Sequence, residues 1–253
     1  MMRRSADPER SPAIPAVTIP GGATTPELDA HLAMPPVGDG PWPGVVVLHE
    51  AFGLIDDIRR QAERLAAAGY LAVAPDLYSA GGVARCIRAT FRSVMSGEGA
   101  AFADIEAARA WLRERPDCTG RVGVIGFCMG GSFALLTARQ FDVSAVNYAH
   151  LPEDLDGVLR GACPIVASYG GKDRTLRGTA AQLEPALERA GVPHDVKEYP
   201  GAGHSFLNTH PFGPGGALLR VAGVGYHGPS AEDAWQRILR FFDAQLRDQA
   251  ETR

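Results

Sequence analysis

The sequence of 253 residues has no long apolar run, no strong excess of charge and only four cysteines. No stretch approaches the ~20 apolar residues of a membrane-spanning helix, so we expect no membrane partner. The formal net charge is -4 and no patch of Lys and Arg runs along the chain, so we expect no nucleic-acid partner. With 45% hydrophobic and 21% charged residues, the composition is that of an ordinary globular protein.

The cysteines do not form a metal-binding pattern. The spacing of Cys86, Cys118, Cys128 and Cys163 contains no C-x-x-C pair, so we expect no metal site. Disulfides are rare in large cytosolic chains, and Cys163 lies in an apolar run, where a free cysteine usually acts as a small buried side chain. Only Cys128 has a context that indicates chemistry.

The first residues of the chain predict a tail rather than a signal. Arg3 and Arg4 resemble the start of a twin-arginine signal, but no apolar segment follows them. We therefore expect residues 1–12 to be a flexible tail of a cytoplasmic protein. Residues 13–253 contain no internal repeat and no long linker, so we expect them to form a single domain.

Short apolar runs alternate with amphipathic segments along the chain, which predicts buried strands alternating with helices. The predicted strands are 44–49, 70–74, 121–127, 143–148, 164–169 and 196–199. The predicted helices are 55–68, 98–113, 130–139, 179–190 and 231–246. The fold class is therefore α/β, with a mainly parallel central sheet and helices on both faces. Segments 16–19 and 28–33 are expected to form an antiparallel hairpin at one edge.

A glycine-rich turn joins one predicted strand to the following helix. Residues 126–131 read Gly-Phe-Cys-Met-Gly-Gly, the G-x-nucleophile-x-G elbow with cysteine in the place of serine. The glycines permit a sharp turn in which Cβ atoms would clash, and the positive end of the helix favours a thiolate at Cys128. Cys128 is the predicted nucleophile; the alternative is a glycine-rich turn with an incidental buried cysteine.

Two further candidates follow in the order nucleophile, acid, histidine. Asp173 comes just after a predicted strand, and His204 lies in a glycine-rich loop before the last helix. Taken alone, each has an ordinary explanation as a turn aspartate or a surface histidine, but three matches in order favour a catalytic triad. Asp173 would orient His204, which would take the proton of Cys128 and later activate water.

Backbone groups complete the predicted machinery. The N–H groups of Met129 and Ala51 are the expected donors of an oxyanion hole, since one follows the nucleophile and the other lies in the loop after strand 44–49. We expect no metal and no organic cofactor, because this chemistry needs neither.

Four segments together resemble the dienelactone hydrolase family: 49–54 (HEAFGL), 126–131, 170–173 (GGKD) and 203–206 (GHSF). Residues 75–78 (PDLY) match as well, and the similarity spans about residues 14–247. The resemblance implies an α/β-hydrolase fold and a hydrolase that cleaves a small carboxylic ester or lactone, through a thioester on Cys128. It also implies that Glu50 helps to activate the thiol, against the alternative of a solvated loop carboxylate.

The sequence departs from the best-known members of this family where they bind a substrate carboxylate. One of their two arginines follows the H-S-F segment by two residues, a position that is Asn208 here. The other follows P-D-L-Y, where Arg85 and Arg88 are candidates and Cys86 is the competing aligned position. Carboxylate binding is therefore an open question. The candidate substrate-binding residues are Phe52, Arg85, Arg88, Phe206 and Asn208.

The long stretch 207–229 is either a lid that selects substrates or a surface insertion. His210 and His227 lie in it, but no ligand spacing supports a metal there. The chain is expected to be a monomer or a homodimer.

Two other functions stay open beside the hydrolase. One is a non-catalytic ligand-binding protein of the same fold, which the complete triad argues against. The other is a redox-sensing thiol at Cys128, with Cys86 or Cys163 as its partner.

Overall fold

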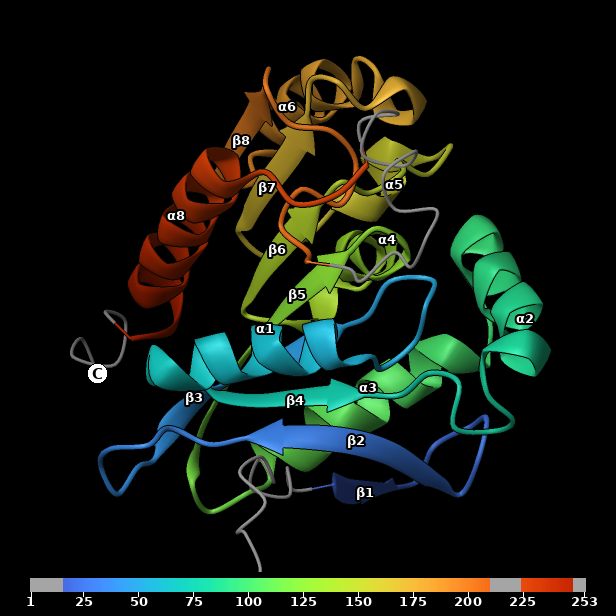
Figure 1. The fold of residues 1–253 in the computed structure, drawn as a ribbon, viewed down its shortest axis with the longest axis vertical. Coiled ribbons are helices and arrows are strands. Elements are labelled where there is room, and N and C mark those ends of the chain that lie inside the picture. Colours follow the sequence, from blue (N-terminus) through green and yellow to red (C-terminus); the bar gives the residue numbers. More distant parts are fainter. Residues whose placement is uncertain (1–15, 210–223, 248–253) are drawn as a thin grey trace, which may run out of the picture.

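The computed structural model describes residues 16–209 and 224–247 and is built around one sheet of eight strands (Figure 1). The strands are β1 (Ala16–Pro20), β2 (Glu27–Ala33), β3 (Trp42–Leu48), β4 (Leu71–Pro75), β5 (Cys118–Phe127), β6 (Val143–Asn147), β7 (Ile165–Gly170) and β8 (His194–Tyr199). Their order is β1-β2-β4-β3-β5-β6-β7-β8. From β4 to β8 all neighbours are parallel, whereas β2 pairs antiparallel with both β1 and β4. The predicted α/β class and the antiparallel edge hairpin are thus confirmed. The expected tail, residues 1–12, lies outside the described residues.

The helices lie on both faces of the sheet. They are α1 (Asp56–Ala67), α2 (Val83–Ser96), α3 (Ala100–Arg113), α4 (Met129–Leu136), α5 (Leu155–Leu159), α6 (Thr179–Ala190) and α8 (Gly228–Leu246), with 3-10 turns at Ala138–Gln140 and Arg174–Leu176. No helix in residues 16–209 or 224–247 is long and apolar enough to cross a membrane.

Burial on both faces explains why the central strands could be predicted from the sequence. Val45, Val46 and Val47 of β3 have no exposed surface, because β3 lies between β4 and β5 and helices cover both faces. A strand in this position is apolar on both faces, so it reads as a continuous run rather than an alternating one.

The two faces carry different helix pairs. Helices α1 and α8 pack together on one face, where Arg64 contacts Glu232 at 2.8 Å and its guanidinium lies 4.8 Å from the centre of the Trp235 ring. On the other face, the rings of Phe102 in α3 and Phe133 in α4 meet edge to face at 5.1 Å. Helix α1 connects β3 to β4 and α4 connects β5 to β6, so the two connections move in opposite directions across the sheet. Because both connections are right-handed, the two helices lie on opposite faces.

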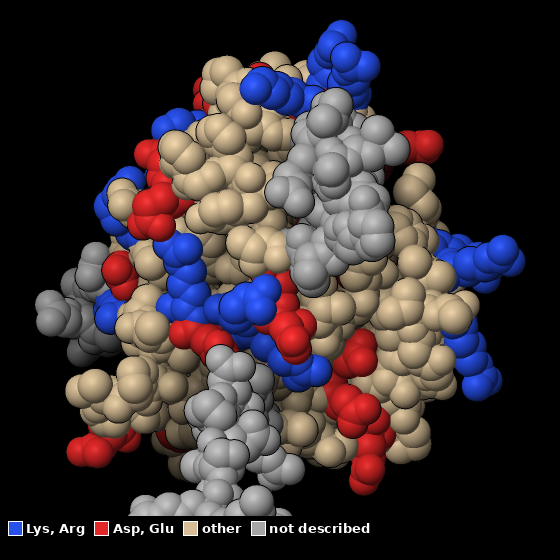
Figure 2. All heavy atoms as spheres, viewed as in Figure 1, with Lys and Arg blue, Asp and Glu red and all other residues tan. Residues whose placement is uncertain are grey.

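Charged side chains on the face in Figure 2 are mixed in sign rather than gathered into one patch. Along α1 the acidic and basic residues are neighbours: Asp56 pairs with Arg59, and Asp57 with Arg60. Neighbours of opposite sign cancel at a distance, so this face presents no strong field of either sign.

Helix α2 was absent from the sequence prediction, which placed no helix between the strand at 70–74 and the helix at 98–113. Its buried residues are Thr90 and Ser93, whereas Phe91 and Met95 are exposed to 39% and 79%. This is the reverse of the usual arrangement, in which a surface helix buries its apolar stripe. Cys86, Ile87 and Val94 pack against the core only in part, and Phe91 and Met95 point away from it.

Candidate active site

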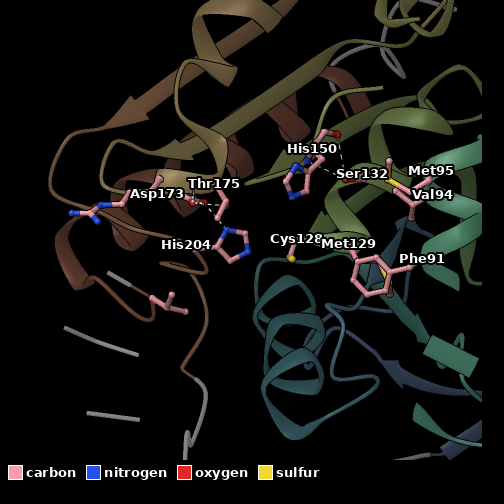
Figure 3. Close-up of a pocket in the computed structure, with 12 residues that line it drawn as sticks. Phe91, Val94, Met95, Cys128, Met129, Ser132, His150, Asp173, Thr175 and His204 are labelled. Carbon is pink, nitrogen blue, oxygen red and sulfur yellow. Dashed lines mark hydrogen bonds and ion pairs between the residues drawn. The ribbon is translucent and has the colours of Figure 1, made fainter. Parts of the chain in front are cut away.

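The predicted catalytic residues gather at the carboxyl ends of the parallel strands, where α/β sheets place their ligands. Cys128 follows β5, Asp173 follows β7 and His204 lies in the loop after β8. Glu50 follows β3. Segments far apart in the sequence thus meet at the carboxyl ends of the parallel strands (Figure 3).

The turn at Cys128 has the strained geometry of a nucleophile elbow. Its φ and ψ are 53° and -114°, a conformation that side chains rarely adopt. A Cβ on Gly126 would overlap the carbonyl of Gly130, and one on Gly131 would overlap the carbonyl of Asn147. Only glycines permit this turn, which leaves Cys128 partly exposed at the start of α4.

A second close approach brings the start of α4 against the end of β3. A Cβ on Gly130 would overlap the carbonyl of Leu48 and lie 2.7 Å from that of His49. The loop that continues from His49 to Ala51 is therefore held beside the elbow. The N–H of Met129 opens a helix and has no intrahelical acceptor, and the N–H of Ala51 has no acceptor among the described residues.

Two buried side chains fix the orientation of the loop that carries Ala51. The N–H of Leu77 donates to Nε2 of His49 at 3.1 Å, so Nδ1 carries the ring proton and donates to the carbonyl of Glu50 at 2.6 Å. Burial lowers the pKa of His49, so the ring is neutral. The hydroxyl of Tyr78 donates to the carbonyl of Ala51 at 3.1 Å. The first bond anchors the peptide group that contains the Ala51 N–H, and the second anchors the peptide group that follows it.

Asp173 and His204 form a short hydrogen bond of 2.5 Å between Oδ2 and Nδ1 (Figure 3). The other carboxylate oxygen accepts from the N–H and the hydroxyl of Thr175, at 2.9 and 2.7 Å. Both oxygens of Asp173 are therefore occupied, and the carboxylate has one orientation. It holds the His204 ring with Nε2 left for Cys128.

The pKa values of this pair move apart. Burial lowers the pKa of His204, but hydrogen bonds to Asp173 and Cys128 outweigh it and raise the pKa to about 10. Burial raises the pKa of Asp173, but hydrogen bonds from His204 and Thr175 outweigh it and hold the pKa below its usual range. At neutral pH the pair is a carboxylate and an imidazolium. An imidazolium beside a thiol favours the thiolate.

Glu50 is buried to 98% beside the nucleophile. Its exposed fraction is 2%, and its Oε1 accepts a hydrogen bond of 2.8 Å from the hydroxyl of Ser205. Ser205 directly follows His204 and has a positive φ of 57°. The loop that carries His204 is thus tied to the loop after β3.

Two recesses meet at Cys128 and His204. The larger has a volume of about 480 Å³ and runs from Asp173 and Thr175, past Cys128, to helix α2. The smaller has about 170 Å³ and is lined by Glu50, Ala51 and Phe52. Cys128 and His204 lie on both, so a bound carbonyl has room on either side of the nucleophile.

The candidate substrate-binding residues separate into two groups. Phe52 is 53% exposed and lines the smaller recess. Phe206 is fully buried against Tyr148 and Tyr199. Asn208 is also fully buried, and its Oδ1 accepts from Gln61 at 3.2 Å. Neither lines a recess.

The two arginine candidates lie on α2. Arg85 and Arg88 are exposed and line neither recess, whereas Phe91, Val94 and Met95 of the same helix do. The family positions for a substrate carboxylate thus carry no cation that faces the larger recess.

Several residues of the site were absent from the sequence prediction. His49, Tyr78 and Thr175 have no motif of their own; His49 and Tyr78 were noted only as parts of HEAFGL and PDLY. Tyr148 is fully buried with a φ of 40°, and its ring lies 5.3 Å from that of His204. A positive φ outside glycine leaves no signal in a sequence, so Tyr148 and Ser205 could not be found that way.

No group of three or more His, Cys, Asp and Glu side chains that could hold a metal occurs in residues 16–209 and 224–247. Nδ1 of His227 lies 2.9 Å from the hydroxyl of Ser230, and His210 lies outside these ranges. All four cysteines are free.

The sheet order, the elbow and the helices on both faces define an α/β-hydrolase. The model of the dienelactone hydrolase family matches residues 28–246, and the chain belongs to this family. The enzyme class that follows is an ester or lactone hydrolase.

Individual relatives agree over most of the chain. A protein of Escherichia coli K12 named "Putative carboxymethylenebutenolidase" is 31% identical over 234 residues, covering 85% of this chain and 82% of its own. A "Putative Dienelactone Hydrolase" structure from Klebsiella pneumoniae has a TM-score of 0.73 at 28% identity, over 91% of this chain and 98% of its own. A dienelactone hydrolase-like promiscuous phosphotriesterase from metagenomic libraries has a TM-score of 0.77 at 25% identity, over 92% and 99%.

Proposed function

We propose that this enzyme cleaves a carboxylic ester or lactone with a Cys128–His204–Asp173 triad, through a thioester on Cys128. The observation that carries the proposal is the charged Asp173–His204 pair, held by a 2.5 Å hydrogen bond, beside a strained cysteine at a helix N-terminus. A structural cysteine would need neither the strain nor the ion pair.

The first half of the reaction forms the thioester. The thiolate of Cys128 attacks the carbonyl carbon, and the N–H groups of Met129 and Ala51 receive the negative charge on the carbonyl oxygen. The carbon–oxygen bond to the leaving group then breaks, and His204 gives its proton to the departing oxygen.

The second half releases the acid. His204, now neutral, takes a proton from water, and the resulting hydroxide attacks the thioester carbonyl. The carbon–sulfur bond breaks, the Cys128 thiolate is restored and the imidazolium is ready for another cycle. The reaction consumes one water and needs neither a metal nor an organic cofactor.

We propose that Glu50 assists this cycle. In those molecules of the enzyme in which Cys128 is a neutral thiol, the carboxylate of Glu50 accepts its proton. Its carboxylate is buried and lines the same 170 Å³ recess as Cys128 and His204. Ser205 holds one of its oxygens, so the group has a defined place beside the sulfur.

A redox-sensing thiol has less support as a second function. Burial raises the pKa of Cys163 to about 12, so this thiol is a poor partner for Cys128. The thiol of Cys86, the other candidate partner, donates to the carbonyl of Tyr78 at 3.7 Å and lines neither of the two recesses that contain Cys128. A reducing compartment keeps a free thiol nucleophile from oxidation, so we propose that the enzyme works in the cytoplasm. We also propose that it is a monomer or a homodimer.

Release of 4-nitrophenol from 4-nitrophenyl acetate by the wild type, Cys128→Ala and Cys128→Ser tests the proposal. We expect many turnovers in the wild type and a loss of at least ~10⁴-fold in Cys128→Ala. Mass spectrometry of quenched enzyme should show an acetyl group on Cys128. Equal release by wild type and Cys128→Ala, with both folded, would refute the triad.

A further inference from the structure

Helix α2 presents three apolar side chains to the catalytic recess, and two of them, Phe91 and Met95, do not pack against the core. Phe91, Val94 and Met95 line the recess of about 480 Å³ that also contains Cys128. Phe91 and Met95 are 39% and 79% exposed, while Thr90 and Ser93 are the buried residues of the helix. Exposed apolar surface that continues into a catalytic recess is typical of a ligand-binding wall.

The position of this wall relative to the triad identifies the part of the substrate that meets it. In Figure 3, Phe91, Val94 and Met95 lie on one side of Cys128, whereas His204 and Asp173 lie on the other. The leaving oxygen of an ester must lie near His204, because that ring supplies its proton. The acyl group on the other side of the carbonyl carbon therefore extends toward α2.

The α2 side of the recess offers a substrate carboxylate no permanent positive charge. Arg85 and Arg88 of α2 do not line the recess, and Asn208 is buried against Gln61. Among the residues that the structure describes, Arg174 is the lining residue with a permanent positive charge, and it directly follows Asp173. A carboxylate on the acyl side would lose water against Phe91, Val94 and Met95 without gaining a cation.

We propose that the preferred substrates are esters or lactones with an uncharged, apolar acyl portion, which Phe91, Val94 and Met95 of α2 hold. This inference rests on the proposed thioester mechanism and names its substrate class. Binding of the acyl chain removes apolar surface from water on both partners. Each methylene placed against the wall should raise kcat/KM about fourfold, until the wall is covered.

A series of 4-nitrophenyl esters with one leaving group tests the preference in the wild type. Acetate, butyrate and hexanoate vary the length of the acyl chain, and the 4-nitrophenyl monoester of glutaric acid has a similar length to hexanoate with a terminal carboxylate. We expect kcat/KM to rise from acetate to hexanoate and to fall at least tenfold from hexanoate to the glutarate ester.

Variants of α2 test whether this helix is the wall. Phe91→Ala and Met95→Ala should bring the ratio of kcat/KM for hexanoate to that for acetate toward one. Met95→Arg should raise the ratio of kcat/KM for the glutarate ester to that for hexanoate at least tenfold, because arginine adds the missing positive charge. Arg92→Ala is the matched control on the same helix, since Arg92 is exposed and does not line the recess. It should keep the wild-type ratios.

The outcomes separate this inference from the function on which it rests. Two results for Cys128-dependent hydrolysis would overturn the apolar acyl site and leave the triad intact. One is a higher kcat/KM for acetate than for hexanoate, and the other is an equal kcat/KM for the glutarate ester and hexanoate. A chain-length preference unchanged in Phe91→Ala and Met95→Ala would also overturn it. Loss of the proposed function would instead appear as equal hydrolysis of every ester by wild type and Cys128→Ala.

Discussion

The His204 side of the larger recess is connected by short hydrogen bonds, whereas the α2 side is formed by apolar side chains with few partners. Asp173 has bonds to both His204 and Thr175, at 2.5 to 2.9 Å, and its side chain is 2% exposed. On the opposite side, Met95 is 79% exposed and no hydrogen bond orients it. In the proposed mechanism, the chemistry would thus depend on fixed geometry, and recognition of the acyl group on apolar area and shape.

This contrast predicts that changes on the two sides affect different quantities. A change beside His204 should lower turnover of every substrate by a similar factor, because all substrates use the same proton transfers. A change on α2 should alter the ratio between substrates. Three experiments on the first side follow, beginning with the largest expected effect.

Asp173→Asn should lower kcat by ~10³ to 10⁴-fold for acetate and hexanoate esters alike. The amide neither stabilises the imidazolium nor fixes the tautomer that the carboxylate selects. Steady-state kinetics on both esters checks this result, with Thr175→Val as a milder control that leaves the His204 bond in place. A loss confined to one ester would break the division between the two sides.

The pH profile should follow the raised pKa of His204. Above pH about 10 the imidazolium loses its proton, so kcat/KM for an alkyl ester, whose leaving oxygen needs that proton, should fall about tenfold for each further pH unit. Hydrolysis by Cys128→Ala is subtracted as the blank. In Asp173→Asn the alkaline limb should move toward neutral pH, because the carboxylate that raises the pKa is gone. An alkaline limb at the same pH in Asp173→Asn and wild type would mean that a group other than His204 causes it.

The same shift has a consequence for stability. A histidine whose pKa is higher in the folded state stabilises the fold fully below its unfolded value of 6.5, and this contribution is lost as pH rises toward 10. The difference in the free energy of unfolding between wild type and His204→Gln should therefore shrink between pH 6.5 and 10. Urea unfolding at several pH values measures it.

His49 offers a smaller effect that tests the loop beside the elbow. His49→Gln keeps an acceptor for the Leu77 N–H but removes the donor to the Glu50 carbonyl, so kcat should fall about tenfold with KM nearly unchanged. His49→Asn keeps a donor at the place of Nδ1 and should retain most of the wild-type kcat. Thermal melting of both variants controls for loss of fold. Equal kcat in the two variants would remove the assigned role of this hydrogen bond.

The sequence predicted the sheet well because its central strands are buried on both faces. Runs such as Val45–Val46–Val47 can only be covered strands, and the elbow glycines prevent clashes that any Cβ would cause. The order of Cys128, Asp173 and His204 then predicted which strand ends meet. These three residues come together because the carboxyl ends of parallel strands lie on the same side of the sheet.

Other parts of the site depend on orientation that a sequence does not record. Helix α2 was missed because its buried residues are Thr90 and Ser93, so its apolar stripe does not mark the core. Arg85 and Arg88 lie on this helix, yet the helix turns Phe91 and its apolar neighbours toward the recess. The tautomer of His49 depends on a bond from Leu77, 28 residues away in the chain.

The ends of α2 give this enzyme a replaceable part. Gly82 and Gly97, with φ values of 74° and 71°, bracket the helix, and it buries only Thr90 and Ser93. Exchange of these fourteen residues would leave the sheet, the elbow and the ion pair in place. A library confined to this one segment is therefore an economical route to new acyl specificities on unchanged chemistry.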